Sequence, residues 1–377
     1  MVRVAVVGCA HGMLDDIYAT VNFVNEMDPE NPVELLLCCG DFECMRNMRD
    51  LETLACPPKY RALHAFHRYY KQEKTAPVLT VFVGGNHEAS GYLKELHYGG
   101  WVAPNMFYLG AAGVINVAEL RIAGLSGIYK QQHYTAGRFE SMPFDNNTMR
   151  SVYHVRELEV FQLSHVQQVD KTPLGVFLSH DWPRGIEQYG NVLQLLRRKP
   201  FFEQEVRTNT LGSPAGEFLM YQLRPQYWFA AHLHVKFAAI VFLALDKCLP
   251  PQSDDAAKTQ FDLEWLAILR ATHHLASSSK FAPRVPQEEM KIEDKDIAWV
   301  KQRLQEFVSE KKLDKIDGEW ITDFVKTAPG HGEEEGPVLV TGNPQTDLLL
   351  ELLKLPHVVT APFVTPPADP CEIDLDL

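Results

Sequence analysis

The 377-residue sequence contains no uninterrupted run of about 18 apolar residues, the length that a membrane-spanning helix needs. Its first residues, MVRVAVVGCAHG, lack the basic segment and the long apolar stretch of a secretory signal peptide. The seven cysteines form no CxxC pair, and a chain of this length can bury a core without a disulfide framework. We therefore expect a globular protein with no membrane span and no signal peptide. Its cysteines are expected to be reduced, and Cys9 alone has a predicted function.

A surplus of basic side chains is also missing, because the formal net charge is −13. The acidic surplus is concentrated in residues 246–377, which carry 25 acidic and 14 basic side chains. Residues 1–245 carry 24 acidic and 22 basic side chains and are nearly neutral. Since a bound nucleic acid needs cations against its phosphates, any such activity is expected in residues 1–245 rather than in the acidic part of the chain.

Short runs rich in Val, Ile and Leu recur in residues 1–245, and each ends in a polar cluster. Continuous apolar runs of this length predict strands that are buried on both faces. The predicted strands are Val2–Gly8, Val33–Cys39, Val78–Gly84, Leu120–Gly127, Leu174–Ser179 and Tyr227–Ala231. Apolar residues at helical spacing predict helices over Leu14–Met27 and Tyr60–Lys71. Together these elements predict a layered α/β domain with helices outside a sheet or a pair of sheets.

The character of the sequence changes after about residue 245. Polar and proline-bearing segments surround a charged amphipathic helix candidate, Asp296–Leu313, and a leucine-rich helix candidate follows Pro337 before a proline-rich acidic end. We expect residues 246–377 to form a smaller C-terminal domain that packs against a larger domain over residues 1–245. The acidity of the smaller domain argues against its being an RNA-binding arm.

Five clusters of candidate ligands follow directly on the predicted strands. They are Gly8-Cys9-Ala10-His11-Gly12, Gly40-Asp41, Gly84-Gly85-Asn86-His87-Glu88, Ser179-His180-Asp181 and His232-Leu233-His234. Ligand sites of open α/β folds gather at the carboxyl ends of strands, so these side chains are expected to form one metal-binding cup. Any one of them, taken singly, is more often structural. His64, His67, His273 and His274 keep that structural interpretation, because no strand end supports them.

The order of the clusters resembles the motifs GDxH, GD, GNHE, H and GHxH of the calcineurin-like metallophosphoesterase superfamily. Cys9 replaces the first aspartate, and Ala231 replaces the glycine of the last motif. The cysteine is a feature of the lariat debranching family. The sequence also resembles that family in the segments CCGDF (38–42), PPKY (57–60), GGNHEAS (84–90), YGGWVAPN (98–105), SGIYK (126–130), RSVYHVRE (150–157), LSHDWPRGI (178–186), NTLGSP (209–214) and ALDKCLP (244–250). The resemblance implies a calcineurin-like β-sandwich flanked by helices, with a smaller C-terminal accessory domain.

The resemblance also implies two divalent metal ions. The implied ligands are Asp41 as a bridge, with Cys9, His11 and His234 at one site and Asn86, His180 and His232 at the other. A thiolate is a soft donor, so Cys9 favours Fe²⁺ or Zn²⁺ over Mg²⁺ or Ca²⁺, and Mn²⁺ is expected to substitute. Two such ions activate a water and clamp a phosphate.

The leaving group implied by the resemblance is the 2′-oxygen of the branch nucleotide, which needs a proton. His87 in the GNHE cluster is the implied general acid, beside the metals rather than bound to them. Glu88 and Asp181 are expected to orient the imidazole ligands.

Residues 126–157 form an insertion rich in aromatic and basic side chains, which resembles the lariat recognition loop of the family. Bases stack on aromatic rings and cations contact phosphates, so the mixture suits single-stranded nucleic acid. The alternative for each residue is packing against the domain. The expected RNA-binding residues are Tyr129, Lys130, Tyr134, Arg138, Phe139, Arg150, Tyr153 and His154.

The implied function is hydrolysis of the 2′–5′ phosphodiester bond at the branch point of excised intron lariat RNA, which gives a linear RNA for turnover. The family implies a nuclear protein, with shuttling to the cytoplasm left open. A monomer and splicing-associated partners are expected. Two alternatives stay open: a nuclease of ordinary 3′–5′ bonds and, further from the motifs, a non-catalytic scaffold of the same fold. A Ser/Thr protein phosphatase is disfavoured, because its GDxVDRG motif is replaced by GDFECMR (40–46).

Overall fold

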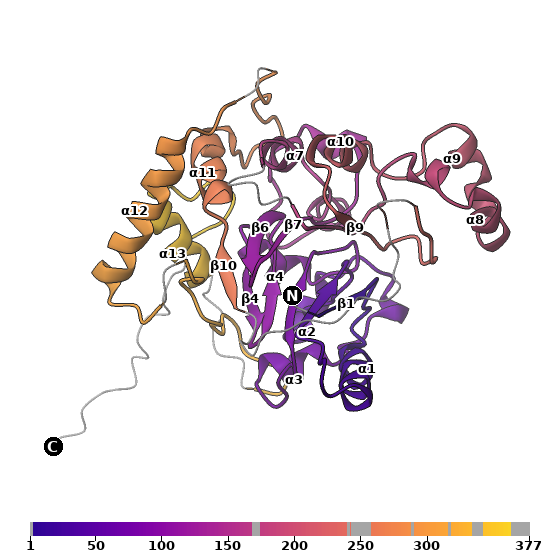
Figure 1. Ribbon diagram of the computed structural model, residues 1–377, viewed down its shortest axis with the longest axis horizontal. Helices are drawn as coiled ribbons and strands as arrows, with labels where there is room; N and C mark the ends of the chain where they lie inside the picture. Colours follow the sequence, from indigo (N-terminus) through magenta and orange to yellow (C-terminus); the bar gives the residue numbers. More distant parts are fainter. Residues whose placement is uncertain are drawn as a thin grey trace.

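The computed structural model describes residues 3–167, 174–239, 242, 258–287, 290–315, 318–333 and 342–362 (Figure 1). Its strands are β1 (Val4–Val7), β2 (Leu35–Cys38), β3 (Leu79–Phe82), β4 (Gly100–Ala103), β5 (Met106–Tyr108), β6 (Ala112–Val117), β7 (Leu120–Leu125), β8 (Val176–Ser179), β9 (Tyr227–Phe229) and β10 (Thr259–Phe261). Its α-helices are α1 (Leu14–Met27), α2 (Met48–Glu52), α3 (Phe66–Tyr70), α4 (Ser90–Glu95), α5 (Gln131–Tyr134), α6 (Thr148–Ser151), α7 (Glu157–Ser164), α8 (Val192–Arg198), α9 (Glu203–Arg207), α10 (Pro214–Leu223), α11 (Leu263–Thr272), α12 (Asp294–Lys311) and α13 (Pro344–Leu353).

The described strands form two sheets. The first has the order β1-β2-β3-β5-β4, in which only β4 runs antiparallel to its neighbour. The second has the order β10-β6-β7-β8-β9, in which β7, β8 and β9 are parallel and β6 and β10 pair antiparallel. The strands that precede the five ligand clusters are β1, β2, β3, β8 and β9. Each of them is parallel to its neighbours within its sheet, so their carboxyl ends share an edge of that sheet.

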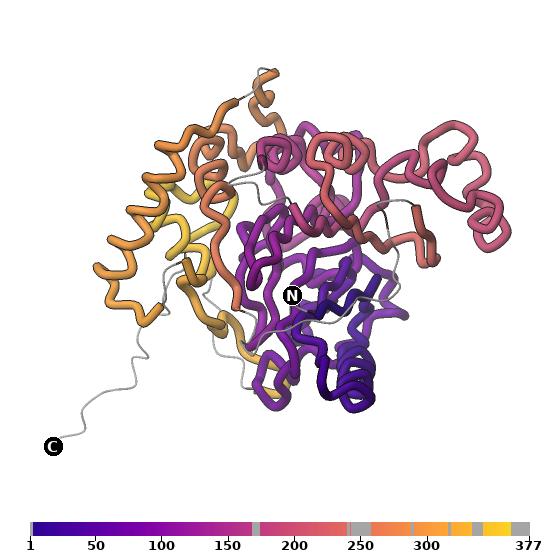
Figure 2. The backbone as a smooth tube through the Cα atoms, viewed as in Figure 1, coloured from indigo at the N-terminus to yellow at the C-terminus, as the bar shows by residue number. Residues whose placement is uncertain are grey.

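Helices cover the outer faces of the two sheets. The side chains of α1, α3 and α4 pack with β2 and β3 in one apolar cluster, and α7 and α11 contact β6 of the second sheet. Helix α12 packs against α11, and α13 packs against α12, at the orange and yellow end of the tube in Figure 2. The site-bearing strands therefore have solid support on both sides, as expected for a layered α/β domain.

The C-terminal part of the chain is built into this framework. Strand β10 pairs with β6, so residues from the predicted smaller domain extend the second sheet. The predicted helix Asp296–Leu313 is present as α12, and the leucine-rich candidate is present as α13. The predicted boundary at residues 245 and 246, the ALDKCLP segment and the acidic end all lie outside the described residues.

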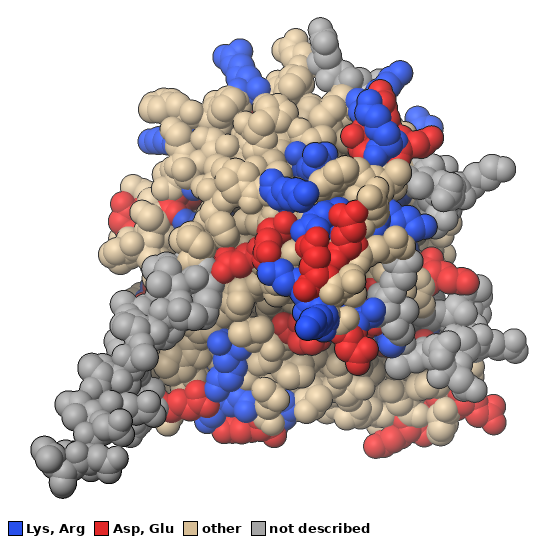
Figure 3. All heavy atoms as spheres, turned by 90° about the vertical axis from the view of Figure 1, so that its left-hand side faces the viewer, with Lys and Arg blue, Asp and Glu red and all other residues tan. Residues whose placement is uncertain are grey.

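Figure 3 shows the face on the α12 side of the molecule. Acidic and basic side chains are mixed on the described part of this face, among a majority of other residues. Charges of the two signs are thus interspersed on this described area rather than gathered into separate patches.

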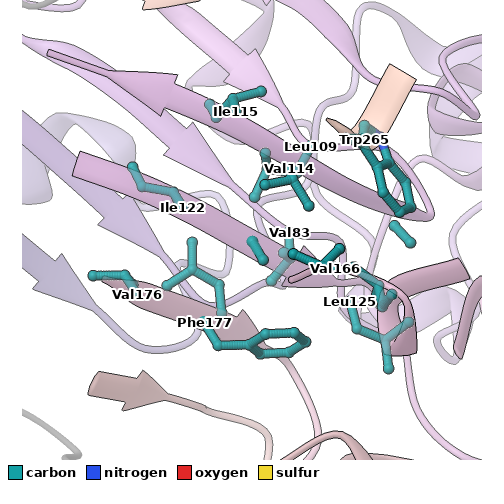
Figure 4. Packing of buried hydrophobic residues seen from close by; sticks show 14 of the residues in the cluster. Val83, Leu109, Val114, Ile115, Ile122, Leu125, Val166, Val176, Phe177 and Trp265 are labelled. Atoms are coloured by element: carbon teal, nitrogen blue, oxygen red, sulfur yellow. The ribbon is translucent and has the colours of Figure 1, made fainter. Parts of the chain in front are cut away.

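The main core lies between the two sheets. Alternation along β2 sends Leu35 and Leu37 into this core and Leu36 into the cluster beneath α1. Figure 4 shows Val83 and Leu109, at the ends of β3 and β5, among side chains of the second sheet. The two sheets are in close contact here, as shown by Gly124, where an added Cβ would collide with the side chains of both Val83 and Leu109. The calcineurin-like β-sandwich implied by the sequence is thus the fold observed.

All six predicted strands are present, but two of them are less buried than predicted. Strands β2, β3 and β8 are fully buried as predicted, whereas β1 is half-buried and Tyr227, the first residue of β9, is exposed, and both of these strands lie at an edge of their sheet. Strands β4, β5, β6 and β10 were not predicted. The five cysteines that the structure describes are free, as expected, and Cys248 and Cys371 lie outside the described residues.

The predicted helix Leu14–Met27 coincides with α1, but the prediction of one helix over Tyr60–Lys71 is wrong. Only Phe66–Tyr70 is α-helical, and Pro58–Tyr60 forms a separate 3-10 turn. The chain between them is extended or bent, and the amide of Ala65 donates to the carbonyl of Gly12 at 3.5 Å. This contact with a distant loop takes precedence over the helical spacing of the apolar residues.

Candidate metal centre

The loops that follow β1, β2, β3, β8 and β9 meet at one place. The amide of His11 donates to the carbonyl of Asp41 at 2.6 Å, which joins the first two loops. The amide of Ala231 donates to the carbonyl of His180 at 3.0 Å, which joins the last two. The structure thereby brings together all seven predicted ligands: Cys9, His11, Asp41, Asn86, His180, His232 and His234.

Four of these ligands have a left-handed backbone conformation. The φ angles are 45° at His11, 49° at Asp41, 61° at His232 and 47° at His234. Such angles cost non-glycine residues about 1–3 kcal/mol each and cluster at functional sites. Gly40 also has a positive φ, of 107°, and a Cβ there would collide with the His180 ring. The loops therefore adopt unfavourable backbone conformations at these positions, and these conformations direct the side chains towards one another.

One group of ligand atoms comes from Cys9, His11, Asp41 and His234. These four atoms all lie within 4.8 Å of one another. The Nε2 atoms of His11 and His234 are 3.0 Å apart, and His11 Nε2 is 3.7 Å from Asp41 Oδ2. Asp41 is almost completely buried, and its Oδ2 has no hydrogen-bond partner among the described residues. A buried carboxylate oxygen without a partner, beside two imidazoles and a thiol, fits a divalent cation.

A second group comes from Asn86, His180 and His232, again with Asp41. His180 Nδ1 lies 2.8 Å from the carbonyl oxygen of Cys39, which can only accept a proton, so the lone pair of neutral His180 is on Nε2. That atom faces Asn86 Oδ1 at 3.0 Å and Asp41 Oδ1 at 3.3 Å. Three electron-rich atoms converge here, and a cation between them would relieve their repulsion. The two oxygens of Asp41 face the two groups, as a bridging ligand requires.

The protonation of these side chains supports the same interpretation. Burial lowers the pKa of His232 to about 4 and lowers the pKa of both His180 and His234, so their imidazoles are neutral ligands at pH 7. Burial opposes ionisation of Asp41, but nearby histidines, His180 first among them, and a backbone hydrogen bond together outweigh it, so the pKa of Asp41 is lowered. Burial, with the Asp41 charge, raises the pKa of the Cys9 thiol to about 12. Cys9 therefore becomes a ligand only by exchanging its proton for a cation.

The predicted role of Glu88 and Asp181 in orienting imidazoles differs from the contacts observed. Glu88 accepts hydrogen bonds from the backbone amides of Phe42, Glu43 and Gly85, at 2.8, 2.8 and 3.0 Å. It therefore clamps the loop after β2 to the loop after β3. Asp181 accepts from the amide of Tyr129 at 3.1 Å and from that of Trp182 at 3.0 Å. Both carboxylates hold backbone rather than imidazole, because Glu88 accepts from three backbone amides and Asp181 accepts from two.

Two groups that do face imidazole ligands were missed from the sequence. One is the backbone carbonyl of Cys39 on His180, which no side-chain pattern reveals. The other is Glu43, whose Oε1 lies 3.5 Å from His11 Nδ1. Its signal was its place two residues after Asp41 in GDFE (40–43), where the loop was already expected to reach the site.

His87 lies beside the ligand groups rather than within them. Its ring centroid is 5.7 Å from that of His11, and its backbone amide donates to Asp41 Oδ1 at 2.8 Å. The bridging carboxylate thus holds the backbone of His87, while its half-buried ring stays adjacent to the ligands. This placement fits a proton donor to a substrate held at the same site.

The segment over residues 126–157, the predicted recognition loop, begins at the site itself. The amide of Gly127 donates to the carbonyl of Gly84 at 2.8 Å, and the amide of Tyr129 donates to Asp181. These bonds attach the segment to the loops that carry Asn86 and His180. Lys130 and Arg150 are exposed, and the rings of Tyr129, Tyr134, Phe139 and Tyr153 are half-buried. These six side chains remain candidates for contacting RNA.

Arg138 and His154 are not placed as the prediction requires. Arg138 Nε donates to Glu159 Oε1 at 3.0 Å, and its Nη1 donates to the carbonyl of Val152 at 2.9 Å. His154 is buried, and its Nδ1 lies 2.7 Å from Nδ1 of His133. Both side chains therefore contact polar groups of the protein rather than solvent, because a buried polar atom needs a polar partner inside the fold.

The C-terminal part of the chain packs against the larger domain, as expected, and contacts the recognition loop there. The amide of Gly137 donates to the carbonyl of Ser279 at 3.0 Å, and that of Arg138 donates to Ser277 at 2.7 Å. A Cβ at Gly137 would collide with both carbonyls, so the approach requires glycine. The two predicted domains are thus joined directly at the loop.

No helix in the described ranges is long and apolar enough to span a membrane. The family model for the calcineurin-like phosphoesterase matches residues 2–236, and the model for the lariat debranching enzyme, C-terminal domain, matches residues 238–358. The chain is similar to the lariat debranching enzyme of Homo sapiens, with 53% identity over 299 residues that cover 72% of this chain and 54% of the human protein.

Other relatives agree over longer alignments. The lariat debranching enzyme of Danio rerio is 43% identical over 94% of this chain and 66% of its own length, and that of Arabidopsis thaliana is 41% identical over 96% and 88%. The chain spans about half the length of the human and mouse relatives. With the ligand geometry and both family models in agreement, the chain belongs to the lariat debranching enzyme family and combines a calcineurin-like phosphoesterase domain with that family's C-terminal domain.

Proposed function

We propose that this chain is a metal-dependent phosphodiesterase that hydrolyses the 2′–5′ bond at the branch point of excised intron lariat RNA, which gives a linear RNA for turnover. The observation that carries the proposal is the attachment of residues 126–157 to the ligand loops through Gly127 and Tyr129. An RNA held by the aromatic and basic side chains of this segment has its branch phosphate beside the ligand atoms. The names of the relatives support the same activity.

The seven converging side chains would hold two divalent cations, with Asp41 between them. When bound, such cations supply positive charge that neutralises a phosphodiester and acidifies the attacking water. Cys9 adds a soft donor to harder nitrogen and oxygen ligands, so we propose Fe²⁺ or Zn²⁺ as the resident ions and Mn²⁺ as a substitute.

The chain's own residues contribute orientation and a proton. As the bond to phosphorus breaks, the 2′-oxygen of the branch nucleotide needs a proton, because an alkoxide is a poor leaving group. His87 is the donor that we propose, since its ring adjoins the ligands and its backbone is held by Asp41. We assign phosphate contacts to Lys130 and Arg150, because they are exposed, and base stacking to the neighbouring half-buried aromatic rings.

We also propose that the protein acts as a monomer in the nucleus, where intron lariats are made, beside splicing-associated proteins. The nuclear location is inferred from the substrate, because intron lariats are made in the nucleus. The sequence itself has no clear basic targeting run. Light scattering of the purified chain and imaging of a tagged chain test these two points, and a dimer or a uniformly cytoplasmic signal would contradict them.

The decisive experiment uses a synthetic RNA in which one adenosine carries both a 2′–5′ and a 3′–5′ linkage. The chain is loaded with Fe²⁺, Zn²⁺ or Mn²⁺ in turn, and Asp41→Ala serves as the control without a bridging ligand. Selective release of the 2′-linked arm with a 5′-phosphate is the expected result. Cleavage of both linkages would instead indicate an ordinary nuclease. A chain that binds metal and cleaves neither linkage would indicate a non-catalytic scaffold.

A further inference from the structure

A carboxylate and a histidine outside the seven ligands form a small cluster behind His11. The two ring nitrogens of His11 face different partners. Nε2 faces the ligand group, at 3.0 Å from His234 Nε2 and 3.7 Å from Asp41 Oδ2, whereas Nδ1 faces Glu43 Oε1 at 3.5 Å. The imidazole of His11 therefore lies between the candidate cation position and a carboxylate.

The carboxylate of Glu43 is held in this place by its surroundings. Glu43 is 6% exposed and has a left-handed backbone with a φ of 62°, which non-glycine residues rarely adopt. Its amide donates to Glu88 Oε2 at 2.8 Å, and its carbonyl accepts from the amide of Met45 at 2.8 Å. The same Glu88 that clamps two ligand loops thus fixes the backbone from which Glu43 projects.

The second oxygen of Glu43 faces His64. Among the described residues, Glu43 Oε2 is buried and has no hydrogen-bond partner, and His64 Nε2 is 3.5 Å away. Gly12 makes this approach feasible, because a Cβ at Gly12 would collide with the His64 side chain. His64 was expected to be merely structural. The chain just before α3 is bent instead of continuing the helix predicted over Tyr60–Lys71, and this bend brings His64 to the site.

We propose that Glu43 and His64 are positioning residues for metal binding. Glu43 accepts the Nδ1 proton of His11, which leaves the Nε2 lone pair aimed at the cation, and His64 holds the second oxygen of Glu43. A carboxylate behind a ligating imidazole fixes its tautomer and orientation, and its loss costs 10–100-fold in metal affinity. Because both separations are 3.5 Å, longer than a strong hydrogen bond, we expect an effect near 10-fold. The inference rests on the proposed function only through the role of His11 as a ligand.

The test compares Glu43→Gln in the full chain with the parent and with Glu52→Gln, which removes an exposed carboxylate of α2. Zn²⁺ affinity is measured by competition with a chelator, and the tautomer of His11 is read from the ¹⁵N shifts of its ring before Zn²⁺ is added. We expect Glu43→Gln to bind one of two Zn²⁺ ions about 10-fold more weakly and to mix the His11 tautomers. Glu52→Gln is expected to match the parent.

Unchanged affinity together with an unchanged His11 tautomer in Glu43→Gln would overturn the proposal. If that variant fails to fold, His64→Gln decides, because the side chain of His64 is 30% exposed and tolerates substitution. A few-fold loss of affinity at one ion supports the pair, and parental affinity refutes it. These readouts do not involve RNA. A chain whose metal affinity depends on Glu43 but which leaves branched RNA intact would refute the proposed function and retain this inference.

Discussion

Replacement of Arg156 by Met is expected to loosen the recognition loop without touching the ligands. Arg156 is 1% exposed, and its guanidinium donates to Glu140 Oε1 at 2.5 Å and to the carbonyl of Ser151 at 3.0 Å. Glu140 is equally buried, and its Oε2 has no hydrogen-bond partner in the described part of the chain. Methionine fills similar space but leaves this carboxylate without its cation, which costs about 3–5 kcal/mol. Arg138 also attracts Glu140, so we expect about 3 kcal/mol.

The assay is hydrogen exchange of backbone amides over residues 126–157, read by mass spectrometry, with β7 as the internal reference. A loss of about 3 kcal/mol from local unfolding corresponds to roughly a hundred-fold faster exchange in the loop. The matched control is Arg150→Met, because Arg150 is exposed and its substitution is expected to change stability by no more than about 0.5 kcal/mol.

The control variant, Arg150→Met, is expected to differ from the parent in RNA binding rather than in the protection of the loop. Arg150→Met is expected to weaken binding and to lower the slope of log affinity against log salt by about 1, as the loss of one phosphate contact does. Parental protection of the loop in Arg156→Met would refute the view that the buried pair holds it. A parental salt slope in Arg150→Met would remove that residue from the RNA-binding surface.

Three further outcomes are expected. Asp41→Ala should lose both bound metal and cleavage, whereas His87→Ala should lose cleavage alone; metal content measured beside rate separates them, and loss of metal in the His87 variant would count against its acid role. Cys9→Asp should shift preference from Zn²⁺ towards harder Mg²⁺, because a carboxylate replaces a thiolate, and competition titration without a shift would contradict the soft-donor argument. Burial lowers the pKa of His97 to about 3, so its imidazole stays neutral in the folded chain at pH values below about 6.5, where the imidazole of the unfolded chain binds a proton. The free energy of unfolding should therefore fall as pH falls from about 6.5 towards 3, by at most about 1.4 kcal/mol per unit, and urea unfolding of His97→Gln at pH 7 and pH 5 should show a smaller decrease than the parent.

Much of the fold was predictable because its signals are local. Each of the six predicted strands is an apolar run that can be recognised without its pairing partner, and α1 combines an apolar face with acidic residues in its first turn. Strand β10 shows the opposite case. It has three residues, and only its pairing with β6, far away in the sequence, makes it a strand.

The candidate site divides in the same way. The sequence alone determined which residue types stand at the strand ends, and parallel strands bring those ends to shared edges, so the five clusters could be identified without the structure, and the family resemblance then supplied the seven candidate ligands. It also determined the family, through the motifs around Cys9 and residues 126–157.

Only the tertiary structure decided which way the remaining polar side chains face. Arg138 and Arg150 are the same residue type in the same loop, yet Glu159 draws one inward and nothing comparable holds the other among the described residues. Glu43 and His64 meet behind His11 because two separate loops pack together there. A charged side chain turns towards whichever opposite charge the fold brings near it, and that partner is set by packing between distant segments rather than by the neighbouring sequence.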